Sequence, residues 1–414
     1  MDEERRDDVY FGIDLSAEDT IVSFYQLNME EPETISTVVG SEAYRIPTFL
    51  AKRKGIGQWF FGAEAKRQVS RGAAVGISNF FETAVDGGKI FVETEEYSAR
   101  DLLTIFLRML LALPGRRYAG ARLARLCICV ERLNMQVVET MTVAAGRLGI
   151  EPGRLLVLDR RESFYYYALS QEPSLFFHDV LLFDCRGNSL SHCILSRDES
   201  TRPQTIQLLQ ETDEDLVEDR DMQFHVICQR ILSERTISSV YLIGDGFDGD
   251  WMKLSLAGLL KGRRVFQGKN LYSKGACYAG AIRDGKKDWP FVYIGNNELK
   301  VNVSLKVLRR SQMQFITLLT AGESWYEQRG ECEVILDGSP EIECWLQRPE
   351  SRKAEIRVLS LHDFPDRENR TTRLRIEAAP ISDRSVRMTI RDLGFGEMVP
   401  STGRIWEHTV SIDG

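Results

Sequence analysis

Apolar and polar residues alternate along the first two thirds of the chain in a way that predicts strands and helices in turn. Residues 9–27 hold two β-rich runs around the polar turn SAED, which is a hairpin pattern. From residue 99 to 113, apolar side chains recur at helical spacing, and residues 134–150 repeat that spacing after an Asn that can cap a helix. A strand pattern, LCICV, lies between these helices. Such alternation predicts a mixed α/β layered domain.

The pattern changes near residue 285. Before it, residues 197–220 are densely charged and predict a loop with a strand inside, and GACYAGAIRDG predicts a last helix. From residue 291 onward, short strand patterns alternate with Gly, Asp, Asn and Pro turns. This arrangement is typical of an all-β sandwich.

Length and charge narrow the class of protein. The 414 residues suggest two or three domains, and the net charge of −8 argues against nucleic acid as a partner. The first residues, MDEERRDD, have no apolar core and do not resemble a secretory signal, so we expect a cytoplasmic protein. The longest apolar stretch, LLTIFLRMLLALP, is shorter than the roughly 20 residues of a bilayer span. We therefore expect no membrane span.

The eight cysteines are scattered, mostly within apolar runs, and show no zinc-ligand spacing. We expect them to be reduced and buried.

Seven segments occur in one order along the chain: FGIDLSAEDT, IPTFLAKRKGIGQWFFGAEAKRQ, LCICVERLNMQVVETMTVAAGRLGI, LVLDRRESFYYYAL, LLFDCRGNSLSHCIL, VYLIGDGF and GACYAGAI. This order resembles the actin-like ATPase superfamily and, within it, the DnaK-type 70-kilodalton heat-shock chaperones. The first and fifth segments resemble the two phosphate loops of that family, and the sixth resembles its adenosine motif. The resemblance covers most of the chain.

The resemblance implies a two-lobed actin-like (ribonuclease H-like) α/β ATPase fold followed by an all-β sandwich. The lobes would be residues 1–170 and 171–288, and the β domain, residues 289–414, would resemble the chaperone's peptide-binding domain. ATP or ADP with Mg²⁺ would be the cofactor, bound weakly or not at all. Protein or extended-peptide clients would bind at the β domain.

The resemblance also implies site residues. The catalytic positions are Lys66, Asp159 and Asp184, and the magnesium ligands are Asp14 and Asp184. The nucleotide-binding positions are Asp14, Ser16, Arg186, Gly187, Ser189, Gly244 and Gly246.

Both phosphate loops depart from the family pattern. Glycine suits these loops because a Cβ obstructs close approach of backbone amides to phosphate. Ser16 stands at such a glycine, and Ala17 and Glu18 replace two hydroxyl residues. In the second loop, Arg186 and Asn188 replace glycines. Arg186 could ion-pair with phosphate, which leaves this loop ambiguous.

The family's nucleotide cleft is also shortened. Only 55 residues separate Asp184 from Val240, where the chaperones insert a subdomain that closes over the adenosine. We expect that subdomain and the chaperone's helical lid to be absent. A cleft without one wall binds its ligand more weakly.

Each candidate residue has a structural alternative. Asp14 and Asp184 could cap turns after strands, and Lys66 could be a solvated lysine on a helix. Asp159 could belong to a surface ion-pair cluster with the charged residues that follow it, residues 160–162.

Three functions are open. The first is a pseudo-ATPase or weak nucleotide binder that acts as a protein-interaction module. The second is a minimal ATP-dependent molecular chaperone in which Arg186 and Lys66 compensate for the lost glycines. The third is an actin-like assembly scaffold that binds partners through exposed sheet edges.

Overall fold

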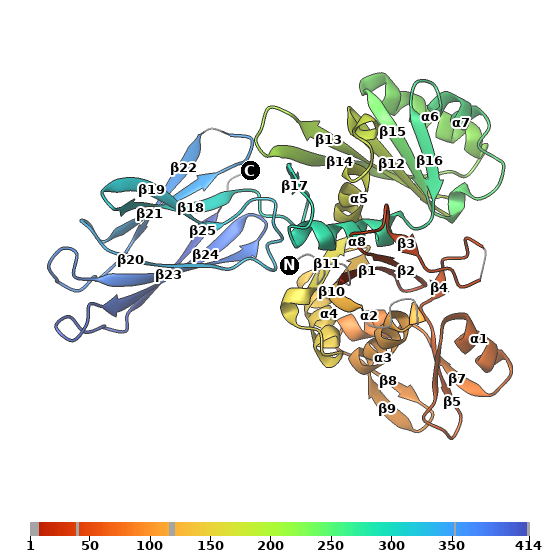
Figure 1. The fold of residues 1–414 in the computed structure, drawn as a ribbon, viewed down its shortest axis with the longest axis horizontal. Coiled ribbons are helices and arrows are strands. Elements are labelled where there is room, and N and C mark those ends of the chain that lie inside the picture. The colour runs from red at the N-terminus through yellow and green to blue at the C-terminus, as the bar shows by residue number, and fades with distance from the viewer. Residues whose placement is uncertain (1–7, 39–40, 116–120, 352, 412–414) are drawn as a thin grey trace. The chain divides into compact units, whose positions relative to one another are not determined.

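The computed structural model describes residues 8–38, 41–115, 121–351 and 353–411. The chain forms two compact units. The first consists of Met1–Ser196 and Leu209–Trp289, and the second of Arg197–Leu208 and Pro290–Gly414. Figure 1 labels their elements. The predicted succession of a mixed α/β region and an all-β region is confirmed.

The first unit contains a mixed sheet in the strand order β11-β10-β1-β2-β3. The central strand, β1, pairs antiparallel with β2 and parallel with β10, and β10 pairs parallel with β11. The short strand β4 also pairs with β2. The bounds are β1 Asp8–Leu15, β2 Asp19–Tyr25, β3 Glu33–Thr34, β4 Ile46–Pro47, β10 Arg122–Val130 and β11 Leu155–Asp159.

Five strands of a second sheet repeat this connectivity, in the order β16-β15-β12-β13-β14. Its central strand, β12, pairs antiparallel with the next strand, β13, and parallel with β15, which pairs parallel with β16. The bounds are β12 Asp179–Arg186, β13 Ser189–Asp198, β14 Gln204–Asp215, β15 Ile237–Ile243 and β16 Arg264–Gly268. In both sheets the central strand pairs with the next strand of the chain as a hairpin. On the side of the central strand away from this hairpin partner lie two strands that run parallel to it.

Helices cover the outer face of each sheet. The apolar sides of α3 (Ala99–Leu111) and α4 (Met135–Arg147) share one buried core with β1 and β10. The Asn134 side chain accepts a hydrogen bond from the Val137 amide at 2.9 Å and caps α4 as predicted. Helices α6 (Arg220–Glu234) and α7 (Leu254–Leu259) contribute to the core of the second sheet.

Smaller elements extend the first sheet's half of the unit. Strands β5, β6 and β7 form a three-stranded sheet with α1 beside it, and β8 pairs with β9 next to α2. The bounds are β5 Leu50–Arg53, β6 Trp59–Phe61, α1 Gly62–Ser70, β7 Ala74–Ile77, α2 Phe80–Val85, β8 Lys89–Val92 and β9 Glu95–Ser98.

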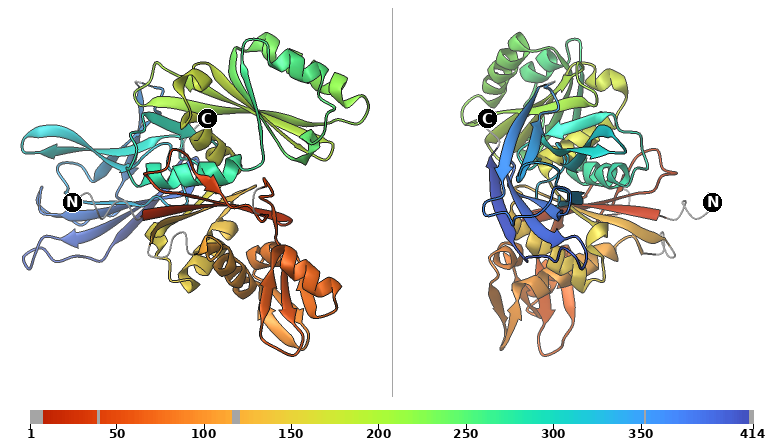
Figure 2. Two further views of the ribbon diagram at one scale, coloured as in Figure 1. Left: turned by 45° about the vertical axis from the view of Figure 1, so that its right-hand side comes forward. Right: turned by 90° about the vertical axis from the view of Figure 1, so that its left-hand side faces the viewer.

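Two helices, α5 (Arg160–Leu169) and α8 (Leu271–Arg283), run between the two sheets (Figure 2). Helix α8 follows β16 of the second sheet but packs on β1 and β2 of the first. Helix α5 follows the first sheet, yet its aromatic residues contact Tyr241 of the second. The helices touch at Gly275, where a Cβ would lie 2.0 Å from the Ser163 carbonyl oxygen. Their N-terminal ends therefore reach the space between the sheets.

The second unit is antiparallel in both of its main sheets, β19-β18-β21-β22 and β20-β23-β24-β25. Both sheets contribute to one buried core. The bounds are β18 Asn302–Arg309, β19 Gln312–Leu319, β20 Gly330–Ile335, β21 Glu341–Gln347, β22 Ala354–Ser360, β23 Arg373–Ser382, β24 Ser385–Gly394 and β25 Ile405–Ser411. A further strand, β17 (Phe291–Ile294), pairs in parallel with residues 204–207, which belong to the same unit.

Candidate functional site

Asp14 and Asp184 lie at matching places in the two sheets of the first unit. Asp14 is next to last in β1, and Asp184 lies two residues before the end of β12, so both central strands deliver a carboxylate near their carboxyl ends. Loops at this end of a sheet are where α/β folds bind ligands. Both carboxylates line one cavity.

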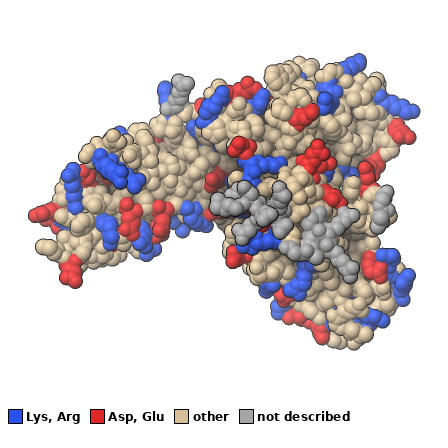
Figure 3. Space-filling model, in the orientation of Figure 1, with Lys and Arg blue, Asp and Glu red and all other residues tan. Residues whose placement is uncertain are grey.

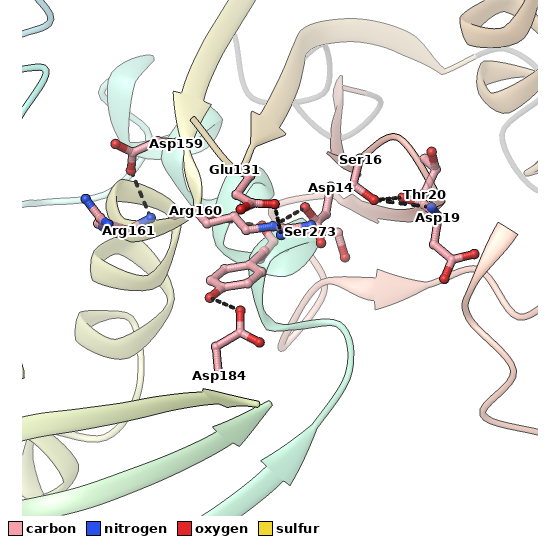
Figure 4. A network of polar contacts seen from close by, with 12 residues as sticks. Asp14, Ser16, Asp19, Thr20, Glu131, Asp159, Arg160, Arg161, Asp184 and Ser273 are labelled. Carbon is pink, nitrogen blue, oxygen red and sulfur yellow. Dashed lines mark hydrogen bonds and ion pairs between the residues drawn. The ribbon is translucent and has the colours of Figure 1, made fainter. Parts of the chain in front are cut away.

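Arg160, the first residue of α5, neutralises Asp14. Its Nε donates to the Oδ1 atom of Asp14 at 2.9 Å, its Nη1 lies 3.5 Å from the Oε2 atom of Glu131, and its guanidinium stacks on the Tyr272 ring (Figure 4). Only 7% of the Arg160 surface is exposed. Burial alone would lower the pKa of Arg160, but the attraction of Asp14 raises it above its ordinary value, so the guanidinium stays charged.

Asp184 is held in a similar way. The Tyr272 hydroxyl donates to its Oδ2 atom at 3.3 Å, and the Arg186 guanidinium approaches both carboxylate oxygens at 3.3 and 3.4 Å. Arg186 also lies 3.6 Å from Glu131. We call these side chains the Arg160 cluster: Asp14, Glu131, Arg160, Asp184, Arg186 and Tyr272.

The cluster separates two cavities. One, the loop-side cavity, has a volume of about 310 Å³ and is lined by residues of both predicted phosphate loops. The other, the arginine-side cavity, has a volume of about 270 Å³ and lies against β13 and the start of α5. Four residues line both: Arg160, Asp184, Arg186 and Tyr272. Pockets for drug-sized ligands measure about 300–1,000 Å³, so the loop-side cavity is at the low end of that range and the arginine-side cavity is just below it.

The first predicted loop is hydrogen-bonded to itself. The Ser16 amide and hydroxyl both donate to the Asp19 carbonyl oxygen, at 3.1 and 2.8 Å, and the Asp19 amide donates back to the Ser16 hydroxyl at 3.2 Å. The amides of Ser16 and Asp19 therefore close the β1–β2 turn.

In the second predicted loop a carboxylate accepts a backbone amide. The Gly187 amide donates to the Oδ1 atom of Asp245 at 3.2 Å, and the Gly187 carbonyl accepts from Arg220 at 3.0 Å. Gly187 has a φ of +57°, which favours glycine.

Gly244 and Gly246 allow two loops to touch. A Cβ on Gly244 would lie 2.0 Å from the Cys185 carbonyl oxygen, and one on Gly246 would lie 2.3 Å from the Cys185 sulfur. These contacts give both glycines a packing role within the protein. Gly244 also lines the loop-side cavity.

The remaining predicted residues lie apart from the cluster. Lys66 is exposed on α1, with its ammonium 5.9 Å from the centre of the Phe49 ring. Asp159 caps α5 by accepting the amides of Arg161 and Glu162, both at 2.8 Å. Neither lines the two cavities. Ser189 is exposed and lines the arginine-side cavity.

The interpretation of residues 160–162 as a surface ion-pair cluster is wrong for two of them. Arg160 is buried against Asp14, and Glu162 is 3% exposed and lies 3.2 Å from Arg283. The sequence signal for this burial is the pair of arginines directly after an apolar strand. The two side chains cannot both face solvent if the helix packs between two sheets.

The donor set at Asp14 and Asp184 does not suit magnesium well. Mg²⁺ needs carboxylates that are free to bind it, whereas these two already face guanidinium groups. Among residues 8–38, 41–115, 121–351 and 353–411, no group of three or more His, Cys, Asp or Glu could hold a metal ion. In the same described part of the chain, no helix is both long and apolar enough to cross a bilayer.

Comparison with known proteins identifies two families without assigning a function. Residues 298–412 match a domain of unknown function, DUF8552. No curated protein matches the chain. Residues 31–296, more than half of the chain, match the C-terminal model of a family of unknown function, DUF5716. The chain therefore belongs to the DUF5716 family.

Proposed function

We propose that the first unit has the two-lobed actin-like (ribonuclease H-like) fold, with lobes at residues 1–170 and 171–288, and that the protein is a divergent relative of the DnaK-type chaperones. The repeated connectivity of the two sheets supports this fold. The two helices that cross between the sheets support it as well.

We further propose that the protein is a pseudo-ATPase or weak nucleotide binder that acts as a protein-interaction module. The observation that carries this proposal is the Arg160 cluster. Protein cations already neutralise the two aspartates that would hold Mg²⁺, and the Asp245 carboxylate already takes the Gly187 amide. A nucleotide would have to break these contacts before it gained any of its own.

The charged side chains that line the loop-side cavity also support weak nucleotide binding. Five carboxylates line it against four cations, so a triphosphate meets a slight excess of negative charge. The carboxylates are Asp14, Glu18, Asp19, Asp184 and Asp245, and the cations are Arg45, Arg160, Arg186 and Lys269.

A minimal ATP-binding chaperone is the second candidate. Arg186 and Lys269 line the same cavity and are about half exposed, so they could turn to a phosphate. Lys66, which the sequence suggested as a further compensating cation, is not among the lining residues.

Isothermal titration with MgATP separates the two candidates. We expect no binding tighter than roughly 10 μM, about −7 kcal/mol, for the natural chain. The variant Asp245→Gly frees the Gly187 amide and removes one carboxylate from the cavity, so it should bind MgATP more tightly than the natural chain does. Tight binding by the natural chain would refute the pseudo-ATPase.

The partner side of the proposal concerns the second unit. Apolar side chains are exposed on one face of the β19-β18-β21-β22 sheet, including Phe315, which contacts Trp345 edge to face. Strands β19 and β22 end that sheet. We propose that extended peptides bind there by adding a strand to an edge. A peptide array probed with the whole chain tests this, and an array without signal above background would refute it.

A further inference from the structure

The arginine-side cavity has a different charge from the rest of the protein. Four arginines line it, against two carboxylates, Glu131 and Asp184. The arginines are Arg132, Arg160, Arg161 and Arg186. The chain as a whole carries a net charge of −8, and on the face shown in Figure 3 basic and acidic side chains are interspersed. Four guanidinium groups around one small cavity are therefore a local exception.

Two of these arginines are not used by the Arg160 cluster. Arg160 and Arg186 are paired with Asp14, Glu131 and Asp184. Within the described ranges, by contrast, neither Arg132 nor Arg161 has a carboxylate within ion-pair distance. Arg132 is exposed and Arg161 is half-buried at this cavity, so an anion between them would meet two guanidinium groups that no carboxylate of the described ranges neutralises.

Hydroxyl groups line the same cavity as the arginines. Ser189 and Ser191 of β13 line the cavity, and the Ser191 hydroxyl donates to the Asp184 carbonyl at 3.4 Å. Ser189 is exposed at the β12–β13 turn. Guanidinium and hydroxyl donors around one cavity match a tetrahedral oxyanion, since arginine binds phosphate oxygens in pairs.

We propose that the arginine-side cavity binds phosphate, either as the free ion or as the phosphate group of a small metabolite, through Arg132, Arg161 and Ser189. Its volume of about 270 Å³ accommodates a phosphate with a small attached group. The proposed site goes beyond the proposed function, because its two arginines lie outside both predicted phosphate loops, it takes only Ser189 from the second loop, and it needs no Mg²⁺.

The test is titration of the natural full-length chain with inorganic phosphate at constant ionic strength and without Mg²⁺. We expect saturable binding tighter than about 1 mM. The double variant Arg132→Gln/Arg161→Gln should bind at least tenfold more weakly. Arg108→Gln, which removes an exposed arginine on α3 far from either cavity lining, should bind phosphate as the natural chain does.

Two further titrants identify the source of the phosphate group and its chemistry. Glycerol phosphate binding more tightly than inorganic phosphate assigns the site to a metabolite, and the reverse order assigns it to the free ion. Malonate tests a dicarboxylate of similar charge. Tighter binding of malonate than of either phosphate, no saturable binding of phosphate, or equal binding by the double variant would each overturn the proposal.

Failure of this site and failure of the proposed function can be told apart. Tight MgATP binding by a chain whose phosphate binding depends on Arg132 and Arg161 would refute the pseudo-ATPase and leave the phosphate site in place. Weak MgATP binding by a chain that does not bind phosphate would refute the phosphate site and leave the pseudo-ATPase proposal in place.

Discussion

Arg160 shows what a sequence can and cannot reveal about a single residue. An arginine at the start of a helix is ordinarily a solvated side chain, and the charged residues around it strengthen that expectation. Its position is decided by Asp14, which lies 146 residues earlier in the chain. No local sequence pattern indicates a contact between residues so far apart in the chain. Asp14 itself could be found, because it lies near the end of a strongly apolar strand.

Replacement of Arg160 by Met should destabilise the first unit. The change leaves the Asp14 carboxylate, which is 7% exposed, without its guanidinium partner. Breaking a buried ion pair on one side costs about 3–5 kcal/mol of unfolding free energy. Urea unfolding followed by circular dichroism measures this loss.

The double variant Arg160→Met/Asp14→Asn provides the matched control. It removes both charges, so it should recover part of the lost stability. A loss below about 1 kcal/mol in Arg160→Met would mean that the pair is weak, as surface ion pairs are.

At the scale of the element, the contact between α5 and α8 depends on one missing side chain. Gly275→Ala would put a Cβ 2.0 Å from the Ser163 carbonyl oxygen, so the helices would have to separate. Overpacking in a tight core costs about 1–3 kcal/mol, occasionally more. We expect a loss at the upper end, measured by urea unfolding, because the obstructing atom belongs to the backbone.

Gly146→Ala is the corresponding change in α4, where an added Cβ meets no heavy atom within 4 Å. Alanine is the better helix former by about 1 kcal/mol, so this variant should be as stable as the natural chain or slightly more stable. Equal losses in both variants would contradict a steric role for Gly275.

Helices α4 and α8 also differ in how well the sequence predicts them. The amphipathic spacing and the Asn134 cap located α4, since one side of that helix faces solvent. Helix α8 begins at Leu271, whereas the pattern indicated only residues 275–285. Its residues are buried almost all around, so no polar side marks its period.

On the scale of the whole molecule, the sequence predicted the order of the α/β and all-β regions but not the path of the chain between the units. Residues 197–208 belong to the second unit because residues 204–207 pair with β17, far along the chain. The charged segment around them predicted a strand inside a loop, and a strand is present there. Its partner could not be predicted, since pairing between distant strands leaves no local signal.

The second unit should nevertheless fold from residues 290–414 alone. The buried core that its two main sheets share is formed by residues between Leu299 and Val410. We expect this fragment to show one cooperative thermal transition and dispersed amide signals in NMR spectra. A fragment without dispersed signals would show that residues 197–208 are required.

Leu374→Ala is the internal control for the same fragment. Leu374 is fully buried, so its truncation should cost about 2–5 kcal/mol and lower the melting temperature clearly. A melting curve unaffected by this change would mean that the transition does not report on the core.

The hydrogen bond from the Gly187 amide to Asp245 makes any phosphate that approaches the second loop a competitor with a tethered carboxylate. The carboxylate is part of the same chain, so its effective concentration at that amide does not fall when the protein is diluted. Raising the concentration of a free ligand is thus an inefficient way to occupy this loop. Replacing Asp245 by glycine would remove this tethered competitor from the Gly187 amide.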